Sequence, residues 1–225
     1  MKRDFVSRRT FCLLSGISGI AGVTMLVASF SINPGLPGDA PVPAMIEFGQ
    51  RHYAGELWGA WLQAVGPVFI VLFAFALVHL AGATQRLAGW MTIFGATTLM
   101  TVSLIEITFY ISGMFVIPPM MPAISIKLVY AVQHLYFMVA APALFFPLGI
   151  VLLASGVLPK VFGYCALILA IGFAAAGAIF MLTLRLPDAV AAAGSVQPIW
   201  WLAAAITLML RRKQVGPAEP GTTKD

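Results

Sequence analysis

Apolar residues are grouped into six long runs, which short polar or proline-rich intervals separate. A helix of about 20 predominantly apolar residues spans the hydrocarbon of a bilayer, and each run reaches about that length. The pattern therefore predicts an all-α integral membrane protein, a bundle of about six transmembrane helices. The predicted spans cover residues 12–30, 57–82, 89–114, 128–154, 161–183 and 190–210.

The longest interval, residues 31–56, begins with a Pro- and Gly-rich loop. From Pro43 onward, apolar and charged residues are mixed in a pattern typical of a short helix on a membrane surface. Trp58 and Trp61 follow, as expected for aromatic residues at an interface. We therefore predict an outer loop and an interfacial helix here. The interval 116–127 is predicted to be a second, proline-rich outer turn.

Prolines predict departures from a straight helix in the second and fourth spans. Pro67 follows a glycine in the second span, and Pro142 and Pro147 lie in the fourth. Proline lacks an N–H and clashes with the carbonyl group four residues earlier, so we expect kinks in both spans. In the sixth span, Trp200 and Trp201 favour an interface, and a kink at the nearby proline would bring them there.

The composition excludes an ordinary soluble domain. Hydrophobic residues make up 60% and charged residues 9% of the 225 residues, and the mean hydropathy is +0.96; a soluble domain has about 25% charged residues. Although the pI is about 9.5, the basic residues stand at the ends of apolar runs, so nucleic-acid binding is not indicated. Cys12 and Cys165 lack the spacing of a metal or disulfide motif.

Residues 1–11 form a basic segment ahead of the first span. The stretch Ser7-Arg8-Arg9-Thr10-Phe11 resembles the twin-arginine export signal of bacteria, which would imply a cleavable or anchoring leader. A cytoplasmic anchor of a first membrane helix is the favoured interpretation, because further spans follow and because the run is long enough to cross.

Three glycines, Gly16, Gly19 and Gly22, give the first span a stripe of small residues. Small residues let helix backbones approach closely within a membrane. We expect this stripe to contact a neighbouring helix, and it is also the candidate contact for a membrane-protein partner or a second copy of the chain.

Basic residues are divided unequally between the two sides of a six-span arrangement. Ten of the 13 Lys and Arg residues lie on the side that both termini share, and three lie on the other side. Positive charge favours the cytoplasmic side, so both termini are predicted to be cytoplasmic in a bacterial inner membrane. Residues 12–210 would form the transmembrane domain, and residues 211–225 a disordered cytoplasmic tail.

Polar residues inside three spans are predicted to meet at one level. Glu106 stands eight residues before the outer end of the third span, ~12 Å below that end. Gln63 and His134 each lie six residues inside their own spans, at ~9 Å. A carboxylate in hydrocarbon costs about 2.5–3.5 kcal/mol on insertion scales, so Glu106 requires a partner or a proton. We predict that Glu106 meets His134 in a polar pocket that opens outward.

Helical spacing adds three residues to this candidate site. Ser103 and Tyr110 share a helix face with Glu106, and Tyr130 stands one turn before His134. The predicted ligand or proton site therefore contains Glu106, His134, Gln63, Tyr110, Tyr130 and Ser103.

Signals for a metal or a haem are weak. His52 and Glu56 share a helix face, but a catalytic zinc ion generally recruits three protein groups, so a solvated helix face is the favoured interpretation. A haem bound by two histidines would need His79 and His134 at one level. His79 lies ~33 Å below the outer end of its span, which argues against that haem.

Several functions fit the polar layer. It could only fix helix packing, in a structural or accessory membrane subunit. It could bind or transport a small ligand, ion or proton, with His134 as relay. It could also serve a membrane-embedded enzyme that acts on a lipid, although the sequence has no HExxH, GxSxG or phosphate-loop motif. Binding or transport is the interpretation we choose, and an enzyme is less favoured.

The predicted topology can be tested with reporter fusions. Alkaline phosphatase fused after residue 225 should be inactive, because it would remain in the cytoplasm, and a fluorescent protein fused there should fluoresce. Phosphatase inserted between residues 34 and 40 should be active. An active phosphatase at the C-terminus would contradict an even number of crossings that starts in the cytoplasm.

Overall fold

The computed structural model describes residues 7–33, 41–115, 121–183 and 188–214, and the regular structure in these ranges is helical. The elements are α1 (Arg8–Ile32), α2 (Val42–Leu80), α3 (Leu87–Phe115), α4 (Met121–Leu135), a π-helical turn (Tyr136–Ala140), α5 (Ala141–Ala154), α6 (Lys160–Thr183), α7 (Asp188–Leu210) and a 3₁₀ turn (Arg211–Lys213). Within the described residues, five helical stretches are long and apolar enough to cross a membrane. The predicted all-α class, with several such helices, is confirmed.

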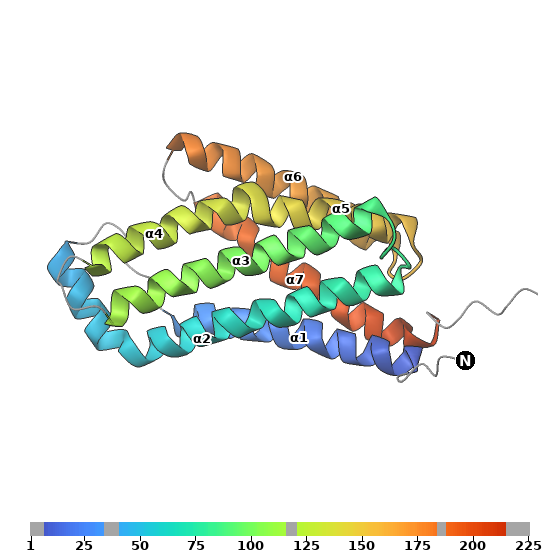
Figure 1. Ribbon diagram of the computed structural model, residues 1–225, viewed down its shortest axis with the longest axis horizontal. Coiled ribbons are helices and arrows are strands. Elements are labelled where there is room, and N and C mark those ends of the chain that lie inside the picture. Colours follow the sequence, from blue (N-terminus) through green and yellow to red (C-terminus); the bar gives the residue numbers. More distant parts are fainter. Residues whose placement is uncertain (1–6, 34–40, 116–120, 184–187, 215–225) are drawn as a thin grey trace, which may run out of the picture.

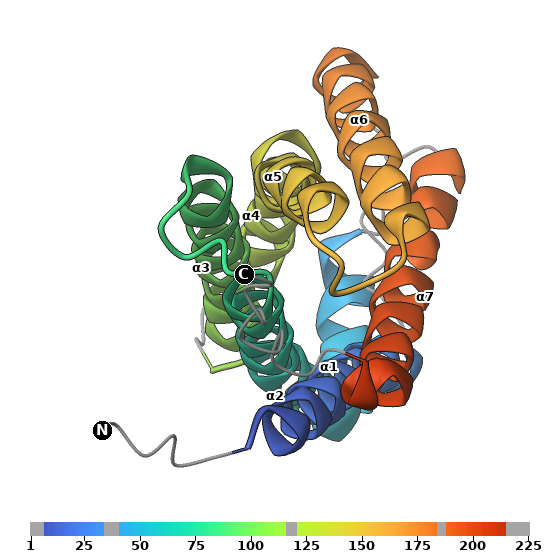
Figure 2. The same cartoon turned by 90° about the vertical axis from the view of Figure 1, so that its right-hand side faces the viewer.

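The helices lie side by side along one long axis (Figure 1). Helix α1 packs against α2 and α7, α3 packs against α2, α4 and α5, and α6 covers α5. Helix α6 stands on the outside of the bundle (Figure 2). Helix α1 begins and α7 ends at the same end of the bundle, which we call the terminal end; α2 begins at the opposite end (Figure 1).

Two helices begin earlier than predicted. Helix α2 is continuous from Val42 to Leu80, so the predicted interfacial helix and second span are one helix. No proline interrupts residues 44–66, and α2 also continues through Pro67. Helix α4 begins at Met121, so the second half of the predicted outer turn is helical. Pro122 is tolerated there because N–H groups in the first turn of a helix have no intrahelical acceptor.

The segments predicted to flank the bundle are partly helical. Helix α1 starts at Arg8, where the Ser7 hydroxyl oxygen accepts a hydrogen bond from the Thr10 N–H at 3.2 Å. The Arg8 guanidinium donates to the Leu80 carbonyl at 3.2 Å, which fixes the start of α1 beside the end of α2. Residues 211–213 of the predicted disordered tail form a 3₁₀ turn, and residues 215–225 lie outside the described ranges.

The fourth span, for which its prolines predict a departure from a straight helix, contains a π-helical turn at its middle. The Ala141 N–H donates to the carbonyl of Tyr136, five residues back, and Pro142 follows at once. Pro142 offers no N–H to the carbonyl of Met138, and the wider π turn lets the chain continue as a helix past that position.

The two tryptophans of α7 belong to the core, so their predicted place at an interface is wrong. Trp201 is 1% exposed, and its ring centroid lies 5.3 Å from that of Phe145 and 5.9 Å from that of Phe73. The Trp200 indole N–H donates to the Phe162 carbonyl at 3.1 Å. Apolar burial among α2, α5, α6 and α7 therefore outweighs the preference of tryptophan for an interface.

The glycine stripe of α1 is used within the chain. A Cβ atom at Gly22 would lie 2.8 Å from the Gly66 carbonyl oxygen of α2. A Cβ atom at Gly16 or Gly19 would lie 3.0 Å or less from Ala205 of α7. Close approach to neighbouring helices is therefore the observed role of these glycines. Their contact with a second protein stays a prediction.

The approach of α3 to α5 depends on Gly95. A Cβ atom there would lie 2.1 Å from the Ala143 carbonyl oxygen. Ala143 stands four residues before Pro147, whose ring nitrogen cannot donate the usual helical hydrogen bond to that carbonyl. Proline on one helix and glycine on the other thus let the two backbones lie against each other.

Substituting Gly95 by alanine should destabilise the bundle. The added methyl group would push α3 away from α5, and overpacking of this kind costs about 1–3 kcal/mol. The matched control is Gly172→Ala in α6, where a Cβ atom would have no neighbour within 4 Å. That control should be stabilised by about 0.5–1 kcal/mol through helix propensity. Thermal unfolding in detergent measures both, and equal stability of the two variants would contradict the close contact.

Candidate functional site

Glu106 joins three helices through its carboxyl group. The side-chain amide of Gln133 in α4 donates to Glu106 Oε1 at 2.9 Å, and Gln63 of α2 also hydrogen-bonds to this carboxyl group. Glu106 and Gln63 are only 9% and 7% exposed. We call Glu106, Gln63 and Gln133 the carboxyl cluster. Within this cluster, the groups that donate hydrogen bonds to Glu106 are the neutral side-chain amides of Gln63 and Gln133, which belong to two other helices.

Tyr110 connects the carboxyl cluster to α1. It stands one turn after Glu106 on the same face of α3, nearer the opposite end of the bundle. Its hydroxyl hydrogen-bonds to the side chain of Asn33, the residue that ends α1. Tyr110 also lies within electrostatic range of Glu106, Glu56 and Tyr130. Polar groups therefore continue from Glu106 towards the opposite end.

His134, which was predicted to meet Glu106, makes a close contact within its own helix. Its Nδ1 atom lies 2.6 Å from the Tyr130 carbonyl oxygen, one turn earlier in α4. The side-chain hydrogen bond that reaches Glu106 from α4 comes from Gln133, the residue before His134. Neighbouring helical residues share a level and point about 100° apart, so Gln133 and His134 face different directions from α4.

Glu56 is buried, although a solvated helix face was predicted for it. Its side chain is 2% exposed, and Oε1 has no hydrogen-bond partner in the part of the chain that the structure describes. Glu56 belongs to the continuous helix α2, not to a separate surface helix, and its burial shows that it faces the bundle. His52 packs its ring on Phe48 at 4.5 Å between centroids. No group of three or more His, Cys, Asp or Glu among the described residues could hold a metal ion.

A second polar pair, absent from the predicted site, lies at the π turn. The Tyr136 hydroxyl donates to Oε1 of Gln197 in α7, and Gln197 is 9% exposed. Tyr136 also lies within electrostatic range of Glu106. Gln197 is a polar residue inside an apolar span, just before a proline, so the rule that selected Gln63 would also have selected it.

Aromatic rings pack against this pair and continue from it towards the terminal end. Tyr136 lies edge-on to Phe137 and Phe173, at centroid distances of 5.3 and 5.9 Å. The Phe173 ring stacks on Phe145 at 6.1 Å, and Phe145 contacts Trp201 at 5.3 Å. The polar side chains described above thus lie on one side of an aromatic layer.

The histidines at 79 and 134 lie at different levels of the bundle. His79 is in the last turn of α2, where its ring meets that of Phe11 at 5.3 Å. His134 lies roughly twenty residues before the end of the same span at Ala154, or ~30 Å along it. One haem could not bind both side chains.

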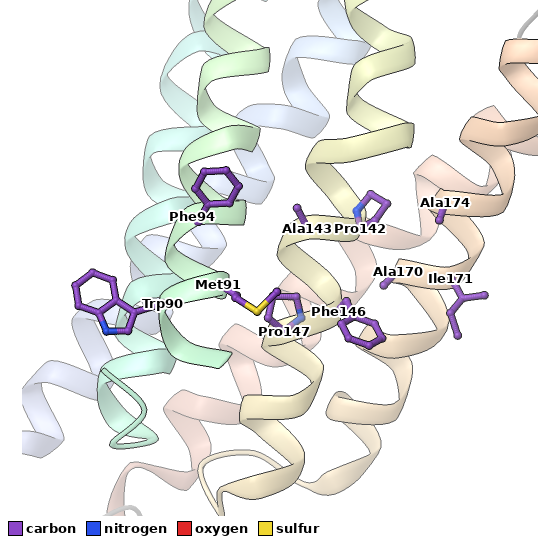
Figure 3. Close-up of a pocket in the computed structure, with 10 residues that line it drawn as sticks. All are labelled: Trp90, Met91, Phe94, Pro142, Ala143, Phe146, Pro147, Ala170, Ile171 and Ala174. Atoms are coloured by element: carbon purple, nitrogen blue, oxygen red, sulfur yellow. The ribbon is translucent and has the colours of Figure 1, made fainter. Parts of the chain in front are cut away.

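An apolar groove of about 680 Å³ lies between α3, α5 and α6 (Figure 3). It is lined by Trp90, Met91, Phe94, Pro142, Ala143, Phe146, Pro147, Ala170, Ile171 and Ala174. None of these residues is charged, and the groove does not include the carboxyl cluster. It offers no acid, base or ligand for a polar molecule, so the candidate site is the carboxyl cluster.

Comparisons with protein-family models, curated proteins and solved structures find no match for this chain. The functional assignment therefore depends on the physical chemistry of the carboxyl cluster.

A double-mutant cycle tests the hydrogen bond between Gln133 and Glu106. Gln133→Leu should lower the free energy of unfolding by about 1–3 kcal/mol, because it removes a donor from a buried oxygen. In a Glu106→Leu background the same substitution should cost much less, since both partners are then apolar. Unfolding in detergent measures the four proteins. His134→Leu should show weaker coupling to Glu106, and equal costs of Gln133→Leu in both backgrounds would contradict the bond.

Proposed function

We propose that this chain is a multi-pass protein of a bacterial inner membrane, with both termini cytoplasmic, that binds a small ligand or ion at the carboxyl cluster from the outer side. The observation that supports this function most directly is a buried acid, Glu106, held by neutral amides from two other helices. Among the described residues, no lysine or arginine pairs with it. Ionisable residues inside a membrane bundle are costly and usually functional.

A purely structural role would not require an acid. A glutamine at position 106 could also hydrogen-bond to Gln63 and Gln133, without the cost of placing an ionisable group in a low-dielectric interior. The two amide bonds do favour a packing role as the second candidate, since they satisfy Glu106 across three helices. The two functions differ in whether an acid is needed at this position.

The arrangement of polar and aromatic side chains supports access from the outer side. Tyr110 and Asn33 continue the polar groups towards the opposite end, which the charge distribution predicts to be outside. Rings that include Phe145 and Phe173 lie towards the terminal end. Passage across the bundle would require that layer to open, so binding is the function that this arrangement supports without a further conformation.

Ligand-dependent stability tests the proposal. Wild-type protein in detergent would be heated with alkali chlorides, small amines, amino acids and sugars. At least one compound should raise the Tm of the wild type and not that of Glu106→Gln. A ligand at a hundred times its Kd stabilises by about 2.7 kcal/mol, which corresponds to roughly 5–10 °C for a chain of this length.

The matched control is Glu47→Gln, because Glu47 is an exposed acid that pairs with Arg51. It should respond as the wild type does. A response that persists in Glu106→Gln, or a wild type that responds to none of the compounds, would leave only the packing role.

A further inference from the structure

Glu56 adds a second buried carboxyl group beside the carboxyl cluster. Its Oε1 atom is buried without a hydrogen-bond partner among the described residues, and Glu56 is only 2% exposed. Glu56 stands seven residues before Gln63, so the two share a face of α2 and lie ~10.5 Å apart along it. Glu56 is therefore the residue nearer the opposite end.

Tyr110 lies between the two acids. It stands one turn beyond Glu106 on α3, and it is within electrostatic range of both carboxyl groups. Its hydrogen-bond partner Asn33 packs on α2 close to Glu56, since a Cβ atom at Gly59 would lie 3.0 Å from Asn33 Cβ. Residues of α1, α2 and α3 thus come together around Tyr110, between the levels of Glu56 and Glu106.

Among the described residues, no lysine or arginine forms a salt bridge with Glu56 or Glu106. The groups near the two acids are Asn33 from α1, Gln63 from α2, Tyr110 from α3, and Tyr130, Gln133 and His134 from α4. Lys127 of α4 is exposed, and Arg51 of α2 pairs with Glu47 on the surface. A buried carboxylate oxygen without a donor is costly, and either a proton or a bound cation would lower that cost.

We propose that Glu56, Tyr110 and Glu106 form a binding site for a small monovalent cation. Glu56 Oε1 contacts the cation, and Glu106, already bonded to Gln133, attracts it through its charge. A zinc ion fits less well, because zinc sites generally recruit at least three protein groups and no group of three or more His, Cys, Asp or Glu among the described residues could hold a metal ion. This inference depends on the proposed function, for which it names the chemical class of the ligand.

The experiment compares apparent affinities from Tm shifts in sodium, potassium, ammonium and methylammonium chloride, with choline chloride holding the ionic strength constant. At least one of the four cations should stabilise the wild type with a saturable dependence on concentration. Glu56→Gln should weaken its apparent affinity at least tenfold, and Glu106→Gln should weaken it also. Glu47→Gln should stay within twofold of the wild type.

The outcomes separate this inference from the proposed function. If Glu106→Gln loses the response and Glu56→Gln keeps it, the role of Glu56 is wrong and the proposed function stands. If only neutral or anionic compounds stabilise the wild type, and Glu106→Gln loses that response, the cation site is wrong and the proposed function stands. If no compound stabilises the wild type, both proposals fail.

A folding control accompanies the series. Each variant must elute as a single species in size-exclusion chromatography. If Glu56→Gln does not, Glu56→Asp replaces it, because it keeps the charge and shortens the side chain by one methylene. Glu56→Asp should bind the cation more weakly than the wild type, and unchanged affinity would overturn the contact.

Discussion

The burial of one carboxyl group among helices is the constraint on which the structure of the polar region depends. An acid in a low-dielectric interior must receive hydrogen bonds or a counter-charge. Glu106 receives amide hydrogen bonds from Gln63 on α2 and Gln133 on α4, so three helices must keep one relative height and one relative rotation. Apolar contacts alone would let these helices slide or rotate into many relative positions, whereas the hydrogen bonds to Glu106 allow few.

Close packing elsewhere in the bundle comes from backbone chemistry. Membrane helices gain little from apolar burial, because lipid tails are also apolar, so close backbone contact contributes more to their association. Gly22 lies against Gly66, and Gly95 lies against a carbonyl group for which Pro147 provides no donor. The proline that disturbs α5 therefore also creates a contact surface for α3. The π turn before Pro142 also takes part in a contact between helices, since its first residue, Tyr136, donates a hydrogen bond to Gln197 of α7.

Polar side chains and aromatic rings divide the bundle into two regions with different chemistry. Glu56, Tyr110 and Glu106 lie towards the opposite end, and the rings around Phe145 and Trp201 lie towards the terminal end. In the function that we propose, the polar region would hold a ligand and the aromatic rings would separate it from the terminal end. Transport would then require those rings to move.

The sequence by itself determined the helical class and the several stretches long and apolar enough to span a membrane, and its prolines indicated that the fourth span is not a regular α-helix, because length, hydropathy and proline act locally along one chain. It could not choose between Gln133 and His134, since adjacent residues share a level and differ only in the direction they face. It also misplaced Glu56 and Trp201, whose burial depends on which helices surround them. Only the tertiary structure decided these points, because rotation of a helix about its axis is determined by its neighbours.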